Sequence, residues 1–265
     1  MVDQRLAPSP VEQAWDQAAL GYDAYFGPRF APYVGAAVGA LLAREQQLPS
    51  GAVLVPCVGP GRELCPLGCA LATRRIAASD LSTEMVSRAR KRAVAYPNVS
   101  VERADASQLS APEGGAAALL SVFGLQLLAD PVSVLAVWLK LLEPGGLCVV
   151  VYWPRDTEAA GPFYSMRRLL RQAGVEDGNW EDRLVSSAES LGGRLLADLP
   201  LRFEMAHDDA RTMWQALTHL GPLRALMLRR GPELIARLGD EFVADLPQGP
   251  LCHTPAARLL LLERG

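Results

Sequence analysis

The sequence predicts an α/β protein with a doubly wound, mostly parallel, seven-stranded sheet, an N-terminal helical arm and a helical cap inserted late in the chain. Three observations support this prediction. Apolar runs of strand length alternate with helix-length segments between residues 53 and 153, a pattern typical of a parallel sheet covered on both faces. The first of these runs ends in Gly59-Pro60-Gly61. The chain has 265 residues, half of them apolar, which suffices for a full hydrophobic core.

The predicted arm occupies residues 1–50. Residues 10–26 have the pattern of an amphipathic helix that ends in an aromatic turn, and residues 32–47 predict a second helix. The first residues have neither a basic start nor an apolar run, so no secretory signal is expected. The longest mostly apolar stretch, residues 114–129, is too short to span a bilayer. We therefore expect a cytoplasmic protein that does not associate with a membrane.

The predicted ligand-binding core occupies residues 51–155. Its strands are expected at 53–58, 75–79, 99–104, 117–122 and 146–153, and its helices at 62–73, 83–95 and 131–142. Residues 156–265 should complete the sheet, with helices at 162–173 and 181–191, a strand at 194–205 and a last strand at 257–263. Helices across residues 208–245 predict a cap, at about 208–250, over the edge where ligands bind.

Charge and cysteine content argue against nucleic-acid-binding and metal-binding proteins. The net charge is -3, and the Lys and Arg residues are scattered along the chain. Nucleic acid is therefore not the expected partner, because phosphate binding needs a concentrated positive face. The five cysteines show no paired metal-ligand spacing, so no metal site is expected.

A glycine-containing loop follows the first predicted strand. Gly59 and Gly61 lack a Cβ, so the backbone can turn sharply and a ligand can approach the main chain and the next helix. A plain connection between a strand and a helix would also use glycines here. Val55 and Cys57 stand where such loops often carry an acid and a first glycine.

Asp80 closes the second predicted strand, 21 residues after Gly59. At this offset a carboxylate can accept hydrogen bonds from both ribose hydroxyls of an adenosine-containing cofactor, and it can also cap the next helix. A dinucleotide site would favour glycine where Leu64 stands. Glu63 would repel a pyrophosphate but suits a cationic sulfonium and ammonium ligand. The loops therefore favour S-adenosylmethionine over a nicotinamide or flavin dinucleotide.

Five segments together resemble, in order and spacing, the motifs of class I S-adenosylmethionine-dependent methyltransferases. They are VLVPCVGPGREL, SDLSTEMVSRARKRA, RADAS, LLSVFGLQLLADP and LLEPGGLCVVVYW. The resemblance covers about residues 50–155 and is greatest to the branch that contains the ubiquinone and menaquinone biosynthesis methyltransferases. It implies a Rossmann-like methyltransferase fold and an enzyme that uses S-adenosylmethionine, with S-adenosylhomocysteine as product and no metal.

The resemblance also implies roles for single residues. Gly59, Pro60 and Gly61 would wrap the methionine end of the cofactor, Asp80 would hold the ribose, and Asp105 would accept from the adenine amino group. The other residues expected at the cofactor are Tyr22, Glu63, Leu81, Met85, Ala106, Ser121, Phe123 and Gln126. Of these, Glu63 is our candidate replacement for the acid missing at Val55.

The substrate is expected to be a small, partly apolar metabolite with an N, O, S or C acceptor. Strand four continues Ser121-Val122-Phe123-Gly124, which differs from the Asn- or Asp-Pro-Pro-aromatic motif of DNA amino-methyltransferases. A protein arginine methyltransferase would be expected to show an acidic pair after that strand, and none appears in the sequence. The candidate substrate contacts are Phe26, Trp153, Phe163 and Trp214, and the candidate general base is His219. Packing of the arm and the cap is the alternative explanation of the aromatic residues, and a position at a helix end is the alternative for the histidine.

Arg167, Arg168 and Arg171 could bind a substrate carboxylate or could form an exposed helix face. Two other functions stay open. Val55 and Cys57 would fit a methyltransferase-fold protein that binds cofactor without catalysis, and the spacing of Gly and Asp residues would fit a nicotinamide-dependent oxidoreductase. The oligomeric state does not follow from the sequence.

Overall fold

The computed structural model describes residues 9–175 and 178–265. Its centre is a seven-stranded sheet with the strand order β3-β2-β1-β4-β5-β9-β6. The bounds of these strands are β1 Ala52–Pro56, β2 Ile76–Asp80, β3 Val99–Arg103, β4 Ala116–Val122, β5 Leu142–Tyr152, β6 Gly193–Arg202 and β9 Ala256–Arg264. Strands β1 to β5 pair in parallel, and β9 runs antiparallel to both β5 and β6. The predicted fold class is confirmed.

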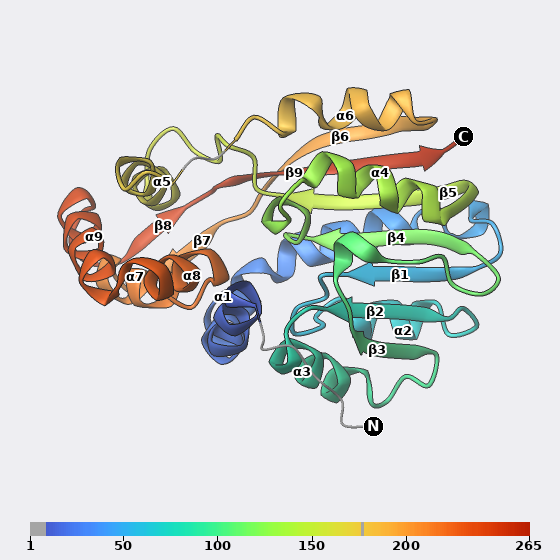
Figure 1. Cartoon of the computed structure of the whole chain (residues 1–265), viewed down its shortest axis with the longest axis horizontal. Coiled ribbons are helices and arrows are strands. Elements are labelled where there is room, and N and C mark those ends of the chain that lie inside the picture. Colours follow the sequence, from blue (N-terminus) through green and yellow to red (C-terminus); the bar gives the residue numbers. More distant parts are fainter. Residues whose placement is uncertain (1–8, 176–177) are drawn as a thin grey trace.

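Helices cover both faces of this sheet (Figure 1). One face packs against α1 Pro10–Leu42, α2 Leu64–Ala70 and α3 Thr83–Ala93. The other face packs against α4 Pro131–Leu141 and α6 Glu181–Ser190. Short 3-10 helices lie at η1 Glu45–Gln47, η2 Ala106–Gln108 and η3 Leu125–Leu127. None of the helices within residues 9–175 and 178–265 is long and apolar enough to cross a membrane.

The N-terminal arm differs from its prediction. Residues 10–42 form one continuous helix of 33 residues, α1, instead of two helices joined by an aromatic turn. Pro28 and Pro32 lie inside it, although each removes a helical hydrogen bond. The helix continues because Phe26, Phe30 and Tyr33 around the prolines are buried, and tertiary packing of this kind overrides local helix propensity. Residues 1–8 of the predicted arm lie outside the described residues.

A buried carboxylate fixes the arm to the core. Asp23 of α1 accepts hydrogen bonds from Arg62 at 2.9 Å and from Arg92 at 2.8 and 2.9 Å. Arg88 lies 3.6 Å away. Arg62 also donates to the backbone oxygen of Asp23, and Arg92 donates to the backbone oxygen of Pro60. This cluster therefore joins the arm, the glycine loop and α3.

The cap is connected to the rest of the chain by a two-stranded antiparallel sheet, β7 Met205–His207 and β8 Leu251–His253. Between these strands lie α7 Ala210–Leu217, α8 Gly221–Arg230 and α9 Pro232–Asp245. Helix α8 packs against α1, and α9 packs against α5 Pro162–Gln172. Strand β8 was missed by the sequence prediction because three residues are too few for a periodic signal. The division into arm, core and capped remainder stays a prediction.

Candidate active site at the carboxyl ends of the strands

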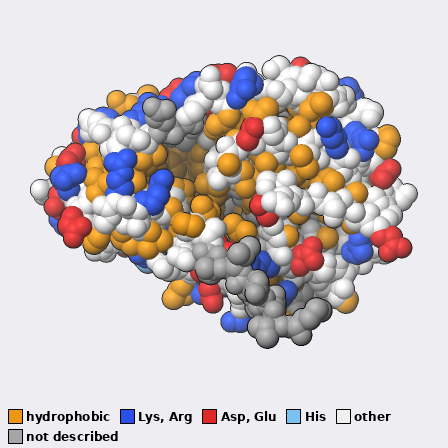
Figure 2. Space-filling model, viewed as in Figure 1, with side chains coloured by type: hydrophobic (Ala, Val, Ile, Leu, Met, Phe, Trp, Pro, Cys, Tyr) orange, Lys and Arg blue, Asp and Glu red, His pale blue; other side chains and the backbone are white. Residues whose placement is uncertain are grey.

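The carboxyl ends of β1, β2, β4 and β5 face the cap and the first half of α1 (Figure 1). In a parallel sheet this edge is where ligands bind, because the loops that leave the strands gather there. Figure 2 shows the surface hollowed in this region, with hydrophobic side chains around the hollow. Three adjoining hollows open at this edge, and Tyr22 and Phe123 line all three.

The loop after β1 turns sharply, as its glycines predict. Cys57 has a φ of 53° and Gly59 a φ of 52°, in the left-handed region that favours glycine. A Cβ at Gly59 would meet nothing within 4 Å, so this glycine borders open space. In contrast, a Cβ at Gly61 would lie 2.9 Å from the Cα of Ala89. Gly59 thus leaves room for a ligand, and Gly61 lets α3 approach.

The carboxylate of Asp80 fixes this loop by a hydrogen bond to its backbone. It accepts from the backbone N–H of Gly59 at 2.8 Å and from that of Ser82 at 2.9 Å. Burial raises the pKa of Asp80 to about 6, although both backbone hydrogen bonds oppose the shift. A half-buried carboxylate with a raised pKa at a sheet edge is typical of a functional site.

The hollow beside Asp80 has a volume of about 100 Å³. Asp105 borders it and accepts from the backbone N–H of Ser107 at 2.8 Å. The structure brings together here the five residues predicted for the adenosine half of the cofactor, namely Asp80, Leu81, Met85, Asp105 and Ala106. Carboxylates at two points of an apolar hollow suit a ligand with hydroxyl and amino groups on flat rings.

The neighbouring hollow lies over the glycine loop. Gly59, Pro60 and Glu63 line it together with Tyr22 of α1. Glu63 is buried, and its pKa is raised to about 7 by burial and by Asp80, against the opposing effect of Arg92 and Arg62. Burial also raises the pKa of Tyr22. Val55, the position at which the resemblance leads us to expect an acid, is fully buried in the core on β1, so Glu63 is the carboxyl that this loop offers.

Two buried oxygen atoms have no hydrogen-bond partner within the described residues. They are Oγ of Ser121 at the end of β4 and Oε1 of Gln126 on η3. A buried polar atom without a partner costs about 1–3 kcal/mol. Gln126 lines the cavity described next, so its oxygen is a group that a ligand would satisfy, whereas Ser121 lines none of the three hollows.

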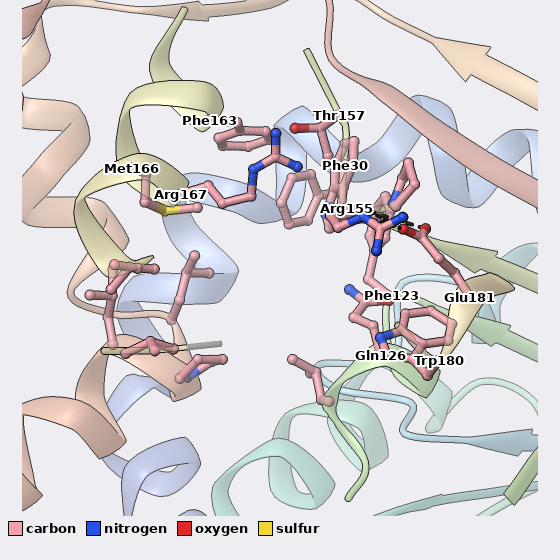
Figure 3. A pocket seen from close by; sticks show the side chains of 18 of the residues that line it. Phe30, Phe123, Gln126, Arg155, Thr157, Phe163, Met166, Arg167, Trp180 and Glu181 are labelled. Atoms are coloured by element: carbon pink, nitrogen blue, oxygen red, sulfur yellow. Dashed lines mark hydrogen bonds and ion pairs between the residues drawn. The ribbon is translucent and has the colours of Figure 1, made fainter. Parts of the chain in front are cut away.

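A third, larger cavity of about 380 Å³ lies between the sheet edge, α5 and the cap (Figure 3). Its inner wall is aromatic, because Phe123 stacks on Trp153 with ring centroids 4.4 Å apart and Phe30 lies 4.9 Å from Phe123. Phe163 contacts Trp153 edge-on at 5.4 Å. The polar side chains around it include Gln126, Arg155, Thr157, Arg167 and Glu181. Most of this lining is apolar, as in sites for small molecules.

Two predicted cofactor residues, Gly61 and Ser121, do not line this cavity or the two smaller hollows, and neither do three predicted substrate and catalytic residues. Phe26 is fully buried between α1 and the sheet. Trp214 packs against Phe242 within the cap, at 5.1 Å. His219 packs on Gly21 of α1, where a Cβ would lie 2.4 Å from the imidazole ring. Burial and Arg224 lower the pKa of His219. All three contribute to packing, and the structure gives no support for a general base at His219.

Several cavity residues were not predicted from the sequence. Trp15 and Phe30 come from α1, and Trp180 lies just before α6. A regular spacing along α1 could have identified Trp15 and Phe30, since Trp15, Tyr22 and Phe30 lie close to two helical turns apart. No comparable pattern marks Trp180, which stands alone in a polar stretch of the sequence.

The comparisons with known proteins agree with this geometry. Residues 53–146 match the family described as a methyltransferase domain. A search of curated protein sequences gives no match. Among solved structures, a magnesium protoporphyrin IX methyltransferase from Synechocystis with bound S-adenosylmethionine is 13% identical. The alignment covers 99% of this chain and 100% of that chain, with a TM-score of 0.59.

Two further structures are similar over nearly the whole chain. The cyclase SpnF is 16% identical, with 98% of this chain and 97% of that chain covered and a TM-score of 0.60. A phosphoethanolamine N-methyltransferase 2 from Haemonchus contortus is 13% identical. The alignment covers 98% of this chain and 61% of that chain, with a TM-score of 0.56. At such identities the structural likeness establishes the fold alone.

Residues 53–146 match a methyltransferase domain, and the sheet that contains them has the Rossmann-like fold of the methyltransferase structures above. The narrower resemblance to the ubiquinone and menaquinone branch stays a prediction.

Proposed function

We propose that this protein transfers a methyl group from S-adenosylmethionine to a small, partly apolar metabolite bound in the 380 Å³ cavity. One observation carries the proposal. The two hollows along Asp105, Asp80, Gly59 and Glu63 adjoin the larger cavity, and Tyr22 and Phe123 border all three. A cofactor lying along the first two would present its methyl group to a substrate in the third.

The residues present fit the cofactor. Asp80 keeps lone pairs free for ribose hydroxyls, since each of its carboxylate oxygens accepts one backbone hydrogen bond. Leu81, Met85 and Ala106 offer an apolar surface for adenine beside the Asp105 carboxylate. The open space over Gly59 would take the methionine end. Glu63 would balance the positive charge of the cofactor's sulfonium and ammonium groups.

Bound S-adenosylmethionine supplies an electrophilic methyl carbon and a neutral leaving group. The protein's part is to orient the acceptor and to exclude water. Phe30, Phe123 and Trp153 form the apolar wall that does both. Gln126 Oε1 can accept a hydrogen bond from an N–H or O–H of the substrate and so turn a lone pair toward the methyl group.

Calorimetric titration with S-adenosylmethionine and S-adenosylhomocysteine tests the proposal. We expect both to bind and NAD to leave the heat signal unchanged. Incubation with radiolabelled S-adenosylmethionine and a fractionated cell extract should then label a small molecule. Binding without any labelled acceptor would favour the non-catalytic alternative, and binding of NAD alone would favour the oxidoreductase. The proposed location of this protein is the cytoplasm.

Glu63→Gln should weaken the affinity for S-adenosylmethionine about tenfold at pH 8 and less at pH 6, because the wild-type carboxyl, with a pKa of about 7, is mostly ionised only at the higher pH. Calorimetry at pH 6, 7 and 8 measures this, with Glu241→Gln on the exposed side of α9 as the matched control. An affinity of the Gln variant equal to that of wild type at pH 8 would reject the electrostatic role.

The same raised pKa predicts an effect on stability. The folded state binds this proton more tightly than the unfolded state does, so the protein without cofactor loses stability as the pH rises from about 4.5 through about 7. In Glu63→Gln the side chain at position 63 does not ionise, so this loss of stability with rising pH is absent. At pH 8 the variant's melting temperature should equal or exceed that of wild type, although its affinity for cofactor is lower.

A further inference from the structure

The substrate cavity contains a cation whose charge is incompletely balanced. Arg167 extends from α5 toward the middle of the cavity (Figure 3), and its side chain is 12% exposed. Its Nη2 lies 3.0 Å from Oδ1 of Asp156, a carboxylate that is itself 79% exposed. Its buried Nη1 has no hydrogen-bond partner among residues 9–175 and 178–265. Arg167 thus has one buried nitrogen without a partner, and it lies where this cavity meets the neighbouring hollow at Asp156.

The second arginine of the cavity, Arg155, has carboxylate partners within the protein. Arg155 pairs with Glu181, whose carboxylate oxygens also accept from the Arg155 backbone N–H at 3.1 Å, and its Nη2 lies 3.4 Å from Asp182. Figure 3 shows Arg155 and Glu181 side by side on one wall. Arg155 is therefore already matched by carboxylates within the protein. The surplus of positive charge in the cavity is concentrated at Arg167.

The polar groups on opposite sides of the cavity define an orientation for a ligand. Gln126 lies on η3, beside the sheet edge where the methyl group is expected, and Arg167 lies on α5 (Figure 3). The walls of the cavity include the aromatic rings of Phe30, Phe123 and Trp153, and the paired Arg155 and Glu181 lie on one side. A molecule that matches this lining has a nucleophilic group at one end, an apolar or aromatic body and an anionic group at the other.

We propose that the substrate is an apolar monocarboxylate, and that Arg167 holds its carboxylate while Gln126 faces the group to be methylated. This inference rests on the proposed function. A guanidinium recognises a carboxylate through parallel N–H···O bonds. One unbalanced positive charge suits a monoanion, whereas a phosphate dianion would leave a buried negative charge. The exposed Asp156 competes weakly, because its charge is screened by solvent.

The test compares two probes of the same shape, 2-naphthoate and 2-naphthamide, by calorimetry in the presence of saturating S-adenosylhomocysteine. Wild type should bind the carboxylate more tightly than the amide, by about tenfold. Arg167→Met should remove this preference and change the affinity for the amide little, because methionine keeps the apolar length of the side chain. Arg167→Lys should restore part of the preference.

Arg168→Met is the matched control, since Arg168 is the next residue of α5 and pairs with Asp245 at 2.9 Å outside the cavity. It should keep the wild-type preference. Equal affinities of wild type for both probes, or an unchanged preference in Arg167→Met, would overturn the inference. Affinity for S-adenosylhomocysteine and the melting temperature show in each variant that the protein is folded. Failure of wild type to bind S-adenosylhomocysteine would instead overturn the proposed function, whatever the probes do.

Discussion

Asp80→Ala should reduce the affinity for S-adenosylhomocysteine by a factor on the order of a hundred or more. The change removes the acceptor proposed for two ribose hydroxyls, and each hydrogen bond to a charged group contributes about 1.5–3 kcal/mol. It also releases the Gly59 N–H from its 2.8 Å hydrogen bond and the Ser82 N–H from its 2.9 Å hydrogen bond. The glycine loop then loses the contact that fixes its position. Calorimetry measures the affinity, and thermal unfolding measures the accompanying loss of stability.

Asp130→Ala is the matched control for this loss. Asp130 also caps a helix, since it accepts from the Ser133 backbone N–H at 3.1 Å, but it is exposed at the start of α4. The control should lose some stability and keep its affinity for S-adenosylhomocysteine. Asp80→Asn keeps the shape and one acceptor oxygen, so its affinity should lie between those of wild type and Asp80→Ala. Wild-type affinity in Asp80→Ala would contradict both the ribose role and the proposed function.

Much of the core was predictable because its signals are local in the sequence. The strands that pair in parallel are short apolar runs, and their predicted bounds agree with the structure to within a few residues, most loosely at the start of β5. The hydrogen bond from Gly59 to Asp80 joins residues 21 apart, a separation that one strand-helix-strand unit fixes. Positions defined by such a unit follow from sequence spacing.

The substrate side was less predictable because its contacts join distant segments. The continuous α1 depends on burial against the sheet, which the two prolines by themselves do not reveal. An aromatic stripe in the cap predicts a buried face but not its partner, and Trp214 turned out to pack on Phe242 rather than on the cavity. Trp180 reaches the cavity from a polar segment. These placements are set by tertiary packing.

The fold leaves the reaction undecided. Both a methyltransferase and a protein described as a cyclase are similar to this chain over 97% or more of each chain. Chemistry follows from the side chains in the site. In this chain Asp80, Asp105 and Glu63 line hollows that suit an adenosine cofactor with a positive charge, which is why binding and transfer assays must both be done.

Asp23→Ala should lower the free energy of unfolding by about 2–4 kcal/mol, somewhat less than the loss of a fully buried ion-pair partner, because the three arginines keep partial contact with solvent. Asp23 itself is 7% exposed, and the side chains of Arg62, Arg88 and Arg92 are 26–29% exposed. Without the carboxylate these three positive charges face one another beside the glycine loop. Urea unfolding measures the change.

The same substitution should affect the site, because the cluster connects α1 to the loop that Gly59 and Pro60 form. Arg92 donates to the backbone oxygen of Pro60, and Arg62 packs over Gly27 of α1. Loosening the arm moves Tyr22 away from the hollows that it borders. We expect weaker binding of S-adenosylhomocysteine and faster cleavage within α1 by protease.

Asp240→Asn, an exposed position on α9, is the control that should leave stability and cleavage unchanged. If Asp23→Ala lowered stability but left the affinity and the cleavage of α1 as in wild type, the cluster would be a support for the fold alone. If stability also stayed unchanged, the three arginines would be adequately solvated without their carboxylate, and the anchoring role would be wrong. The expected result makes the arm part of the binding site, since burial of Asp23 and closure over the cofactor then depend on the same contacts.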